Sequence, residues 1–180
     1  MEKIGVFCAS SNEMEQKFYD KAAELGRMLG KAGKTLVYGG NSSGLMEAVA
    51  KATKEAGGKV FGVVPRKLVE AGRVSDCVDI TFYCEDLNDR KQWLIGESDV
   101  MIVLPGSAGT LDEAFSAIAS NTFGMHKKKV IFWNIDGFYD KLFEFLDELV
   151  GRGVVNKPWI EVMERVTTVE EIEKIVKSEK

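Results

Sequence analysis

The stretch that decides the fold is Leu104-Pro105-Gly106-Ser107-Ala108-Gly109-Thr110-Leu111-Asp112-Glu113. It follows an apolar run that begins at Val100, and its small residues form a loop after the Pro-Gly pair. Thr110 has the residue type of a helix N-cap, so we predict a strand, a tight loop and a helix that begins near Thr110. The free amides and the positive dipole end of such a helix favour a bound anion. A carboxylate one turn further on suggests chemistry on a phosphorylated small molecule.

Outward from this stretch, short apolar runs alternate with segments of helical period. The predicted strands are residues 4–9, 35–38, 59–64, 78–83, 99–104, 129–134 and 159–163. The predicted helices are residues 15–31, 45–56, 86–96, 110–123, 138–150 and 169–177. Apolar strands that alternate with helices are typical of a parallel sheet covered on both faces. We therefore predict an α/β sandwich of three αβα layers, with about six to seven parallel strands in one domain over residues 1–180.

The composition excludes several classes of function. The hydrophobic fraction of 45% and the charged fraction of 29% are ordinary for a soluble globular protein. The net charge of −4 argues against a nucleic-acid partner, which would require a basic face. Lys127-Lys128-Lys129 is the only basic run, and we expect it to be a solvated loop. No apolar run approaches the roughly 20 residues of a membrane span, and the first residues do not have the pattern of a signal peptide.

The cysteines and the single histidine give no metal-binding pattern. Cys8, Cys77 and Cys84 form no CxxC pair, so we predict no metal site. Free thiols fit a reducing compartment, which indicates a cytoplasmic location. His126 is expected in a loop before a strand, and no G-x-S-x-G motif supports a catalytic triad that would use it.

Three predicted strands end in loops of small residues. These loops are Ala9-Ser10-Ser11, the glycine-rich loop from Gly39 to Gly44, and the Pro105 to Thr110 loop. The carboxyl ends of parallel strands share one edge of a sheet, where ligands bind, so we expect the three loops to converge on a ligand. The glycine-rich loop matches neither the G-x-G-x-x-G fingerprint nor a P-loop, because Leu45 stands where the P-loop lysine would be. A redox cofactor or a nucleoside triphosphate is therefore disfavoured.

Each of these features also has a structural alternative. The glycine-rich loop could serve only the close packing of a strand and a helix. Thr110 and Glu113 fit a capping box, in which the Glu113 side chain would bond to the Thr110 amide. Ser10 and Ser11 could cap the first helix or shape its loop. The run Asn88-Asp89-Arg90-Lys91 could be a solvated helix face, unless the end of its helix faces the glycine loops.

The motifs together resemble the LOG family, whose members are the cytokinin-activating nucleoside 5′-monophosphate phosphoribohydrolases, long mislabelled as lysine decarboxylases. The resemblance covers nearly the whole chain, including Asn134-Ile135-Asp136-Gly137-Phe138-Tyr139-Asp140. The motifs that carry it are Val6-Phe7-Cys8-Ala9-Ser10-Ser11, Leu36-Val37-Tyr38-Gly39-Gly40 with Gly44-Leu45-Met46, Asp89-Arg90-Lys91 and Pro105-Gly106-x-x-Gly109-Thr110-x-x-Glu113.

The resemblance implies a Rossmann-like nucleotide-binding homodimer that hydrolyses the N-glycosidic bond of an AMP-like nucleotide to a free base and ribose 5-phosphate. It implies that Arg90 and Glu113 are the catalytic pair, that the Pro-Gly-x-x-Gly-Thr loop holds the phosphate, and that no metal or cofactor is needed. The residues expected to bind substrate or phosphate are Ser10, Gly39, Gly40, Gly44, Met46, Lys91, Pro105, Gly106, Gly109 and Thr110.

The chemistry of this reaction suits the expected residues. Cleavage of a ribosyl–base bond builds oxocarbenium character on the sugar, as in glycoside hydrolysis. The carboxylate of Glu113 near C1′ would stabilise that charge or orient the water. Arg90 would bind the base or the carboxylate through its planar fork of donors. The amides of Gly109 and Thr110, with the Thr110 hydroxyl, would bind the phosphate.

The chain departs from the LOG pattern at several positions. Asn41, Glu47 and Ser107 stand where family members usually carry glycine, and Asn88-Asp89 stands where they usually carry His-Glu. If Ser107 had to adopt a left-handed backbone, the cost would be on the order of 1–2 kcal/mol, whereas asparagine tolerates that conformation. Glu47 adds negative charge near the expected phosphate site.

These departures keep two further interpretations open. One is a non-catalytic carrier or sensor of a phosphorylated ligand, similar to molybdenum-cofactor carrier proteins, which share this general fold. The other is a purely structural α/β protein in which Glu113 caps its own helix.

Overall fold

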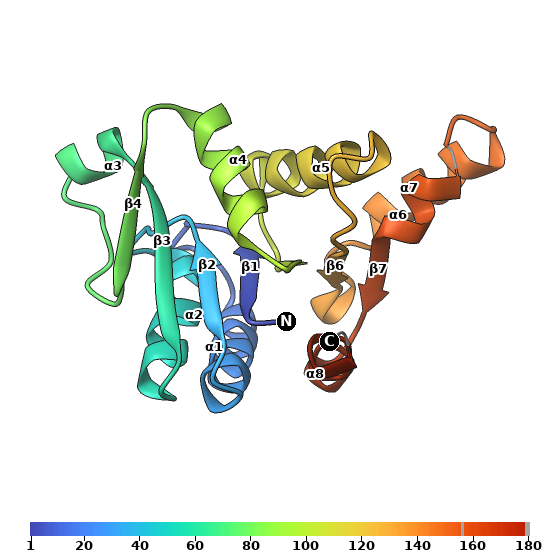
Figure 1. Ribbon diagram of the computed structural model, residues 1–180. Helices are drawn as coiled ribbons and strands as arrows, with labels where there is room; N and C mark the ends of the chain where they lie inside the picture. Colours follow the sequence, from blue (N-terminus) through green and yellow to red (C-terminus); the bar gives the residue numbers. More distant parts are fainter. Residues whose placement is uncertain (156, 179–180) are drawn as a thin grey trace.

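The strands form the parallel sheet that the alternation of strands and helices predicts. The computed structural model describes residues 1–155 and 157–178. Within these residues the chain forms a seven-stranded sheet in the order β4-β3-β2-β1-β5-β6-β7, and each pair of neighbours is parallel. Helices cover both faces, so the predicted three-layer α/β fold is confirmed (Figure 1).

The element bounds agree with the predicted ranges to within a few residues over most of the chain. The strands are β1 Lys3–Phe7, β2 Thr35–Tyr38, β3 Lys59–Pro65, β4 Ile80–Cys84, β5 Val100–Val103, β6 Val130–Trp133 and β7 Met163–Val166. The helices are α1 Gln16–Lys31, α2 Gly44–Glu55, α3 Arg66–Glu70, α4 Leu87–Glu97, α5 Ala108–Thr122, α6 Asp140–Gly151, α7 Lys157–Val162 and α8 Val169–Ser178, with a 3-10 turn η1 at Ile135–Gly137.

The central strands send alternate side chains into two cores. In β5, Val100 and Ile102 pack with residues of α1, α2 and α8. Met101 and Val103 face the opposite side and pack with residues of α4, α5 and α6. Successive strand residues point to opposite faces, so a strand covered on both sides needs apolar side chains at every position. This requirement explains why β5 reads as a continuous apolar run.

The strand order reverses between β1 and β5, which lie side by side in the middle of the sheet. β1 continues toward β2, β3 and β4 (Figure 1), whereas in the strand order β5 continues toward β6 and β7. The loops after β1 and β5 are joined by a hydrogen bond in which the Ala9 amide donates to the Pro105 carbonyl at 3.1 Å. Open α/β sheets bind ligands at such a reversal, so the topology brings two of the three predicted loops to the expected place.

Three predictions about individual elements are wrong. α5 begins at Ala108 with Ser107 in the N-cap position, so Thr110 is in the first helical turn and is not the cap. The predicted strand at 159–163 is largely helix, because α7 occupies Lys157–Val162 and β7 begins only at Met163. Short apolar runs do not distinguish helix from strand, which explains why α7 was predicted as a strand. The edge strand β7 contains charged residues and therefore lacks the apolar pattern by which a buried strand is recognised. Ser10 and Ser11 do not cap α1, whose N-cap is Glu15, but Ser11 does shape the loop before it, since its hydroxyl accepts from the Glu13 amide at 3.2 Å.

Candidate functional site

Arg90 and Glu113 lie together at the carboxyl edge of the sheet, although they come from different helices. Arg90 is in α4 and Glu113 is in α5. The Nη1 atom of Arg90 is 3.6 Å from Oε1 of Glu113, and the two side chains are only 14% and 9% exposed. The burial contradicts a solvated role for Arg90. The structure therefore pairs the two residues that the sequence singled out for catalysis.

The position of Arg90 depends on the start of α4 and on Gly39. Oδ1 of Asp86, the N-cap residue, accepts hydrogen bonds from the amides of Asn88 at 2.7 Å and Asp89 at 2.8 Å, and so fixes the first helical turn. The guanidinium then extends over the sheet edge, where Nε donates to the Val63 carbonyl at 3.4 Å. A Cβ atom at Gly39 would lie 1.7 Å from Nη2 of Arg90, so this position requires glycine.

Glu113 has an environment that suits a proton-transfer group. Burial raises the pKa of Glu113 to about 7, against the opposing effect of the Arg90 charge. At neutral pH both protonation states are therefore populated. Burial and the nearby Glu113 charge raise the pKa of the Cys8 thiol, at the end of β1, so this thiol is protonated beside the pair. The capping-box alternative is wrong, because Ser107 is the N-cap and Glu113 lies in the second turn of α5.

The N-terminus of α5 has free hydrogen-bond donors. Among the described residues, the amides of Ala108, Gly109 and Thr110 have no hydrogen-bond partner. The Thr110 side chain is 4% exposed and lies against Gly106, where a Cβ atom would be 2.1 Å from the Thr110 hydroxyl oxygen. Gly106 is therefore required by the packing of Thr110. The three amides are available to an anion.

The N-terminus of α2 differs, because the loop after β1 occupies its donors. The Gly44 amide donates to Oδ1 of Asn12 at 2.8 Å, and the Ala9 carbonyl accepts from Leu45 at 3.0 Å and from Met46 at 3.4 Å. A Cβ atom at Gly44, which has φ +62°, would lie 2.5 Å from the Ser10 carbonyl carbon. The close-packing role considered for this glycine is therefore present. A substrate contact by Ser10, Gly44 or Met46 stays a prediction.

A segment that the sequence did not single out pairs with the glycine-rich loop. The Ser42 amide donates to the Arg73 carbonyl and the Ser75 amide donates to the Gly40 carbonyl, both at 2.9 Å, and Asn41 forms an antiparallel bridge with Val74. We call residues 73–75 the pairing segment. Gly40 turns the chain with φ +73°. The pairing fixes the backbone on which the Arg90 guanidinium rests.

The residues that replace family glycines fit without a left-handed backbone. Ser107 has φ −102°, and Asn41 is not among the described residues with positive φ, so neither position requires glycine for its backbone conformation. The Glu47 side chain accepts a contact from the Cys77 thiol at 3.7 Å. The strain that Ser107 could have introduced is therefore absent from the backbone at this position.

Lys91 joins α4 to α5 beside Arg90 and Glu113. Its Nζ atom is 2.9 Å from Oδ2 of Asp112, the residue before Glu113. This ion pair stands between the two helices that carry Arg90 and Glu113. In this structure the Lys91 ammonium group is therefore paired with a carboxylate. A phosphate contact by Lys91 stays a prediction.

Tyr139 stabilises the end of β5 and was missed as a site residue. Its buried hydroxyl donates to the Leu104 carbonyl at 2.6 Å, directly before the Pro105 loop. The side chain of Asn134 accepts from the Tyr139 amide at 2.8 Å and donates to Asp140 at 2.7 Å. The signal was present in the sequence, since Asn134 to Asp140 is one of the motifs of the resemblance.

Two hollows lie among the loops and helices that surround Arg90 and Glu113. One of about 370 Å³ lies between the loops after β1 and β5 and is lined by Ser10, Ser11, Gly106, Ser107 and Phe138, among others. The other, of about 490 Å³, lies beside α3 and α4 and has Arg90, Leu68, Ala71, Arg73 and Leu87 in its lining.

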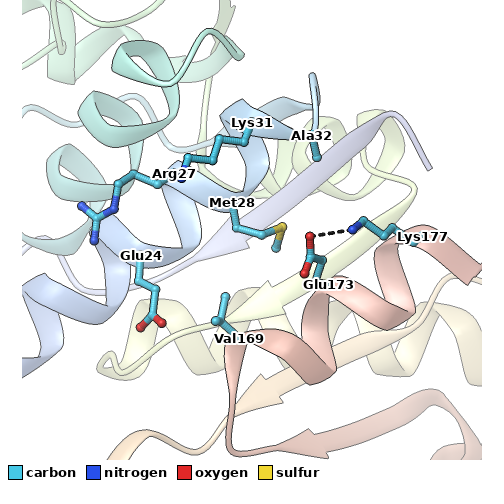
Figure 2. Close-up of a pocket in the computed structure, with 8 residues that line it drawn as sticks. All are labelled: Glu24, Arg27, Met28, Lys31, Ala32, Val169, Glu173 and Lys177. Atoms are coloured by element: carbon cyan, nitrogen blue, oxygen red, sulfur yellow. Dashed lines mark ion pairs between the residues drawn. The ribbon is translucent and has the colours of Figure 1, made fainter.

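A third hollow lies away from these residues. Figure 2 shows it between α1 and α8, with Met28 and Val169 among charged side chains and an ion pair between Glu173 and Lys177. Its lining shares no residue with the two hollows beside the pair.

The described part of the chain has neither a cluster of metal-ligating residues nor a helix that could span a membrane. Within residues 1–155 and 157–178, no three His, Cys, Asp or Glu residues form a group that could hold a metal ion. No helix in that part of the chain is both long and apolar enough to cross a membrane. The three cysteines are free, and His126 lies in the loop before β6 as predicted.

Comparison with known proteins agrees with this geometry. The family described as "Possible lysine decarboxylase" matches residues 46–176. The chain is 37% identical over 154 residues to cytokinin riboside 5′-monophosphate phosphoribohydrolase LOG5 of Arabidopsis thaliana, which covers 86% of this chain and 68% of that protein. It is 34% identical over 172 residues to LOG3 of the same plant, with 96% and 80% covered.

A solved structure shows the same fold along almost the whole chain. The molybdenum cofactor binding protein from the phototrophic bacterium Rippkaea orientalis aligns with a TM-score of 0.76 and 25% identity, over 98% of this chain and 96% of that one. The extent of the family match and the identity to curated relatives lead to one conclusion. The chain belongs to the LOG family.

Proposed function

We propose that the protein hydrolyses the N-glycosidic bond of an AMP-like nucleoside 5′-monophosphate to a free base and ribose 5-phosphate. The observation that carries the proposal is the buried pair of Arg90 and Glu113, 3.6 Å apart, near the free amides of α5. The names of the relatives support it, because LOG5 and LOG3 are phosphoribohydrolases of cytokinin riboside 5′-monophosphates.

The proposed mechanism starts with the phosphate at the N-terminus of α5. The amides of Gly109 and Thr110 and the Thr110 hydroxyl bind the phosphate, and this anchor places the ribose over Glu113. The C1′–N bond breaks as water adds to C1′. The base leaves with the bonding electrons and takes one proton, which balances the proton that the attacking water gives up to Glu113 and that Glu113 then returns. The ionised Glu113 stabilises the oxocarbenium character and accepts the proton of the attacking water.

Arg90 has two tasks in this mechanism. Its positive charge keeps part of the Glu113 population ionised at neutral pH, against the effect of burial. Its planar donor fork also holds the carboxylate or the base in one orientation. Gly39 leaves room for the guanidinium, and Gly40 and Gly44 shape the loop beside it.

We also propose one domain over residues 1–180 that works in the cytoplasm as a homodimer on free nucleotides. Membership of the LOG family and the net charge of −4 support the choice of a small nucleotide over a nucleic acid. Support for a dimer comes from Phe123 and Met125 at the end of α5, which are 90% and 77% exposed.

The function is tested by incubating the protein with a panel of nucleoside 5′-monophosphates and separating bases from nucleotides by liquid chromatography. We expect release of base and ribose 5-phosphate in equal amounts, and its loss in the Glu113→Gln variant. The proposal fails if every nucleotide of the panel stays intact at the rate of that variant.

A second candidate is a carrier of a phosphorylated ligand without catalysis. It is favoured by the likeness of the fold to the molybdenum cofactor binding protein over 98% of the chain. The same incubation discriminates between them, because a carrier would retain the phosphorylated ligand and return it chemically intact after denaturation.

A further inference from the structure

Glu47 brings a carboxylate to a partly buried group of polar side chains behind the glycine-rich loop. It lies in the first turn of α2, where LOG family members usually carry glycine, so the carboxylate is a property of this chain. Its Oε1 atom accepts from the Cys77 thiol at 3.7 Å, and its Oε2 atom is buried without a hydrogen-bond partner within the described residues. Burying a carboxylate costs free energy unless new contacts compensate for the lost water. The contacts of Glu47 therefore indicate what the residue does.

Tyr38 adds a second buried polar group to the same place. It ends β2 directly before Gly39, and its fully buried hydroxyl has no hydrogen-bond partner in the described part of the chain. Burial raises the pKa of Tyr38, the Ser75 hydroxyl opposes this, and the Glu47 charge raises the pKa further, so the three side chains are neighbours. A tyrosine hydroxyl is a donor and a carboxylate is an acceptor. We call Tyr38, Glu47, Ser75 and Cys77 the polar cluster.

Cys77 gives the Glu47 carboxylate its contact with a tight turn. Burial raises the pKa of the Cys77 thiol, and the Glu47 carboxylate raises it further, so the thiol keeps its proton and can donate. The Cys77 amide donates to the Ser75 hydroxyl at 3.1 Å, and the Val78 amide donates to the Ser75 carbonyl at 3.4 Å. These two bonds close the turn over residues 75–78 and join Cys77 to Ser75.

Ser75 connects this turn to the backbone beside Arg90. As the last residue of the pairing segment, it donates its amide to the Gly40 carbonyl at 2.9 Å. The preceding Gly39 lies against the guanidinium, since a Cβ atom there would be 1.7 Å from Nη2 of Arg90. The contacts therefore run without a gap from Glu47 to the backbone next to Arg90.

We propose that Glu47 is a positioning residue that holds the pairing segment against the glycine-rich loop and thereby keeps Arg90 in place to act with Glu113. The inference rests on the proposed function for the reaction that Arg90 serves. Glu47 acts through the backbone of the loop and not on the substrate. A glycine in its place has no side chain to contact Cys77, so this connection between α2 and the turn before β4 is an addition of this chain.

The first test measures kcat/KM for AMP by release of base. Glu47→Ala should lower kcat/KM about tenfold, mainly through kcat, because a misplacement of about 1 Å costs about 100-fold and a loosened loop displaces the guanidinium by less. Glu47→Gln keeps an oxygen that accepts from the thiol and should stay within about twofold of the wild type. The matched control is Glu55→Ala, at the exposed end of the same helix, which should have full activity. Full activity of Glu47→Ala would overturn the proposal.

The second test asks whether the effect passes through Cys77 and Arg90. Cys77→Ala removes the partner of the carboxylate and should lower kcat/KM by a similar factor, and the double variant with Glu47→Ala should lose no more than the weaker of the two single variants. In the background of Arg90→Ala, Glu47→Ala should cost nothing further. A full tenfold loss in that background would show that Glu47 does not act through Arg90, which contradicts the inference.

The third test needs no catalysis and follows the amide hydrogen exchange of the paired backbone by NMR. The amides of Ser42 and Ser75 donate across the pairing, so both should exchange about fivefold faster in Glu47→Ala than in the wild type. The amide of Met101 in β5, which donates to the Lys129 carbonyl at 3.1 Å, should be unchanged. Equal acceleration of all three amides would mean a general loss of stability, and unchanged exchange of Ser42 and Ser75 would mean no connection; either result overturns the inference.

The two proposals can fail separately. If AMP is hydrolysed and Glu47→Ala changes neither kcat/KM nor the exchange of the paired amides, the role of Glu47 is wrong and the proposed function stands. If every nucleotide stays intact, the proposed function is wrong, and the exchange experiment alone decides whether Glu47 holds the pairing segment.

Discussion

The substitution Gly39→Ala should displace Arg90 without changing the fold. The added Cβ atom would lie 1.7 Å from Nη2 of Arg90, and real Cβ contacts are essentially never shorter than 3.0 Å, so the guanidinium must move by more than an ångström. The backbone of Gly39 is outside the left-handed region, so alanine itself introduces no strain. Because a misplacement of about 1 Å can cost about 100-fold in rate, we expect kcat/KM for AMP to fall about 100-fold.

The assay is steady-state release of base, and two further variants make it specific. Gly96→Ala is the matched control, because Gly96 is in the same helix as Arg90 and a Cβ atom there meets no atom within 4 Å. It should keep full activity. If Gly39 acts through Arg90, then Gly39→Ala should cost nothing further in the background of Arg90→Ala.

The pH profile gives the same substitution a second readout. The Arg90 charge lowers the pKa of Glu113 against burial, so moving the guanidinium away should raise that pKa above its value of about 7. If the ionised carboxylate is the active form, the limb of kcat/KM that rises with pH should move to higher pH. Retention of activity within threefold, with an unmoved limb, would refute the reasoning.

Three other variants test the supports of the site. Glu113→Gln should lower kcat about 100- to 10,000-fold, as expected for loss of a group that transfers protons. The folded protein holds the Glu113 proton more tightly than the unfolded chain, so the free energy of unfolding should fall by about 3 kcal/mol as pH rises from 4.5 through about 7. Urea titrations should show this slope in the wild type and not in Glu113→Gln; equal slopes would contradict the burial argument. Asp86→Ala removes the cap of α4 and should cost about 1 kcal/mol in urea unfolding, together with some activity through Arg90. Tyr139→Phe leaves the buried Leu104 carbonyl without its donor and should cost about 1–3 kcal/mol, whereas an unchanged Tm would show that this bond contributes nothing.

The sequence predicts the sheet well because its central strands have a pattern that few other folds share. β2 was predicted at its observed bounds, and β5 was recognisable because both of its faces are buried. The end of the chain was harder, because the edge strand β7 carries Glu164 and Arg165 and lacks that pattern. The pattern of apolar residues reflects how much of a strand is buried. An edge strand is only partly buried, so this pattern is weak there.

For the candidate site, residue types predict which residues belong to it, whereas the contacts between them are known only from the packing of the structure. Arg90 and Glu113 were found through the motifs, and their contact is a matter of geometry that spacing cannot give. The start of α5 was misjudged, because Thr110 has the residue type of a cap and its side chain is instead packed on Gly106. Asn12 and the pairing segment were missed, because their contacts join residues distant in sequence. Asn12 accepts from the Gly44 amide through its side-chain oxygen, and the pairing segment bonds through backbone groups that every residue type possesses.

The pairing segment limits how this protein can change during evolution. Residues 73–75 belong to the connection between α3 and β4, a surface connection of the kind that usually tolerates insertions and deletions. Here a change in length would pull on Gly40 and Ser42, and thereby on the backbone beneath the guanidinium. Divergence in substrate choice is therefore expected to proceed by replacing side chains such as Leu68 and Leu87 around the neighbouring hollow, while the length of the connection stays constant.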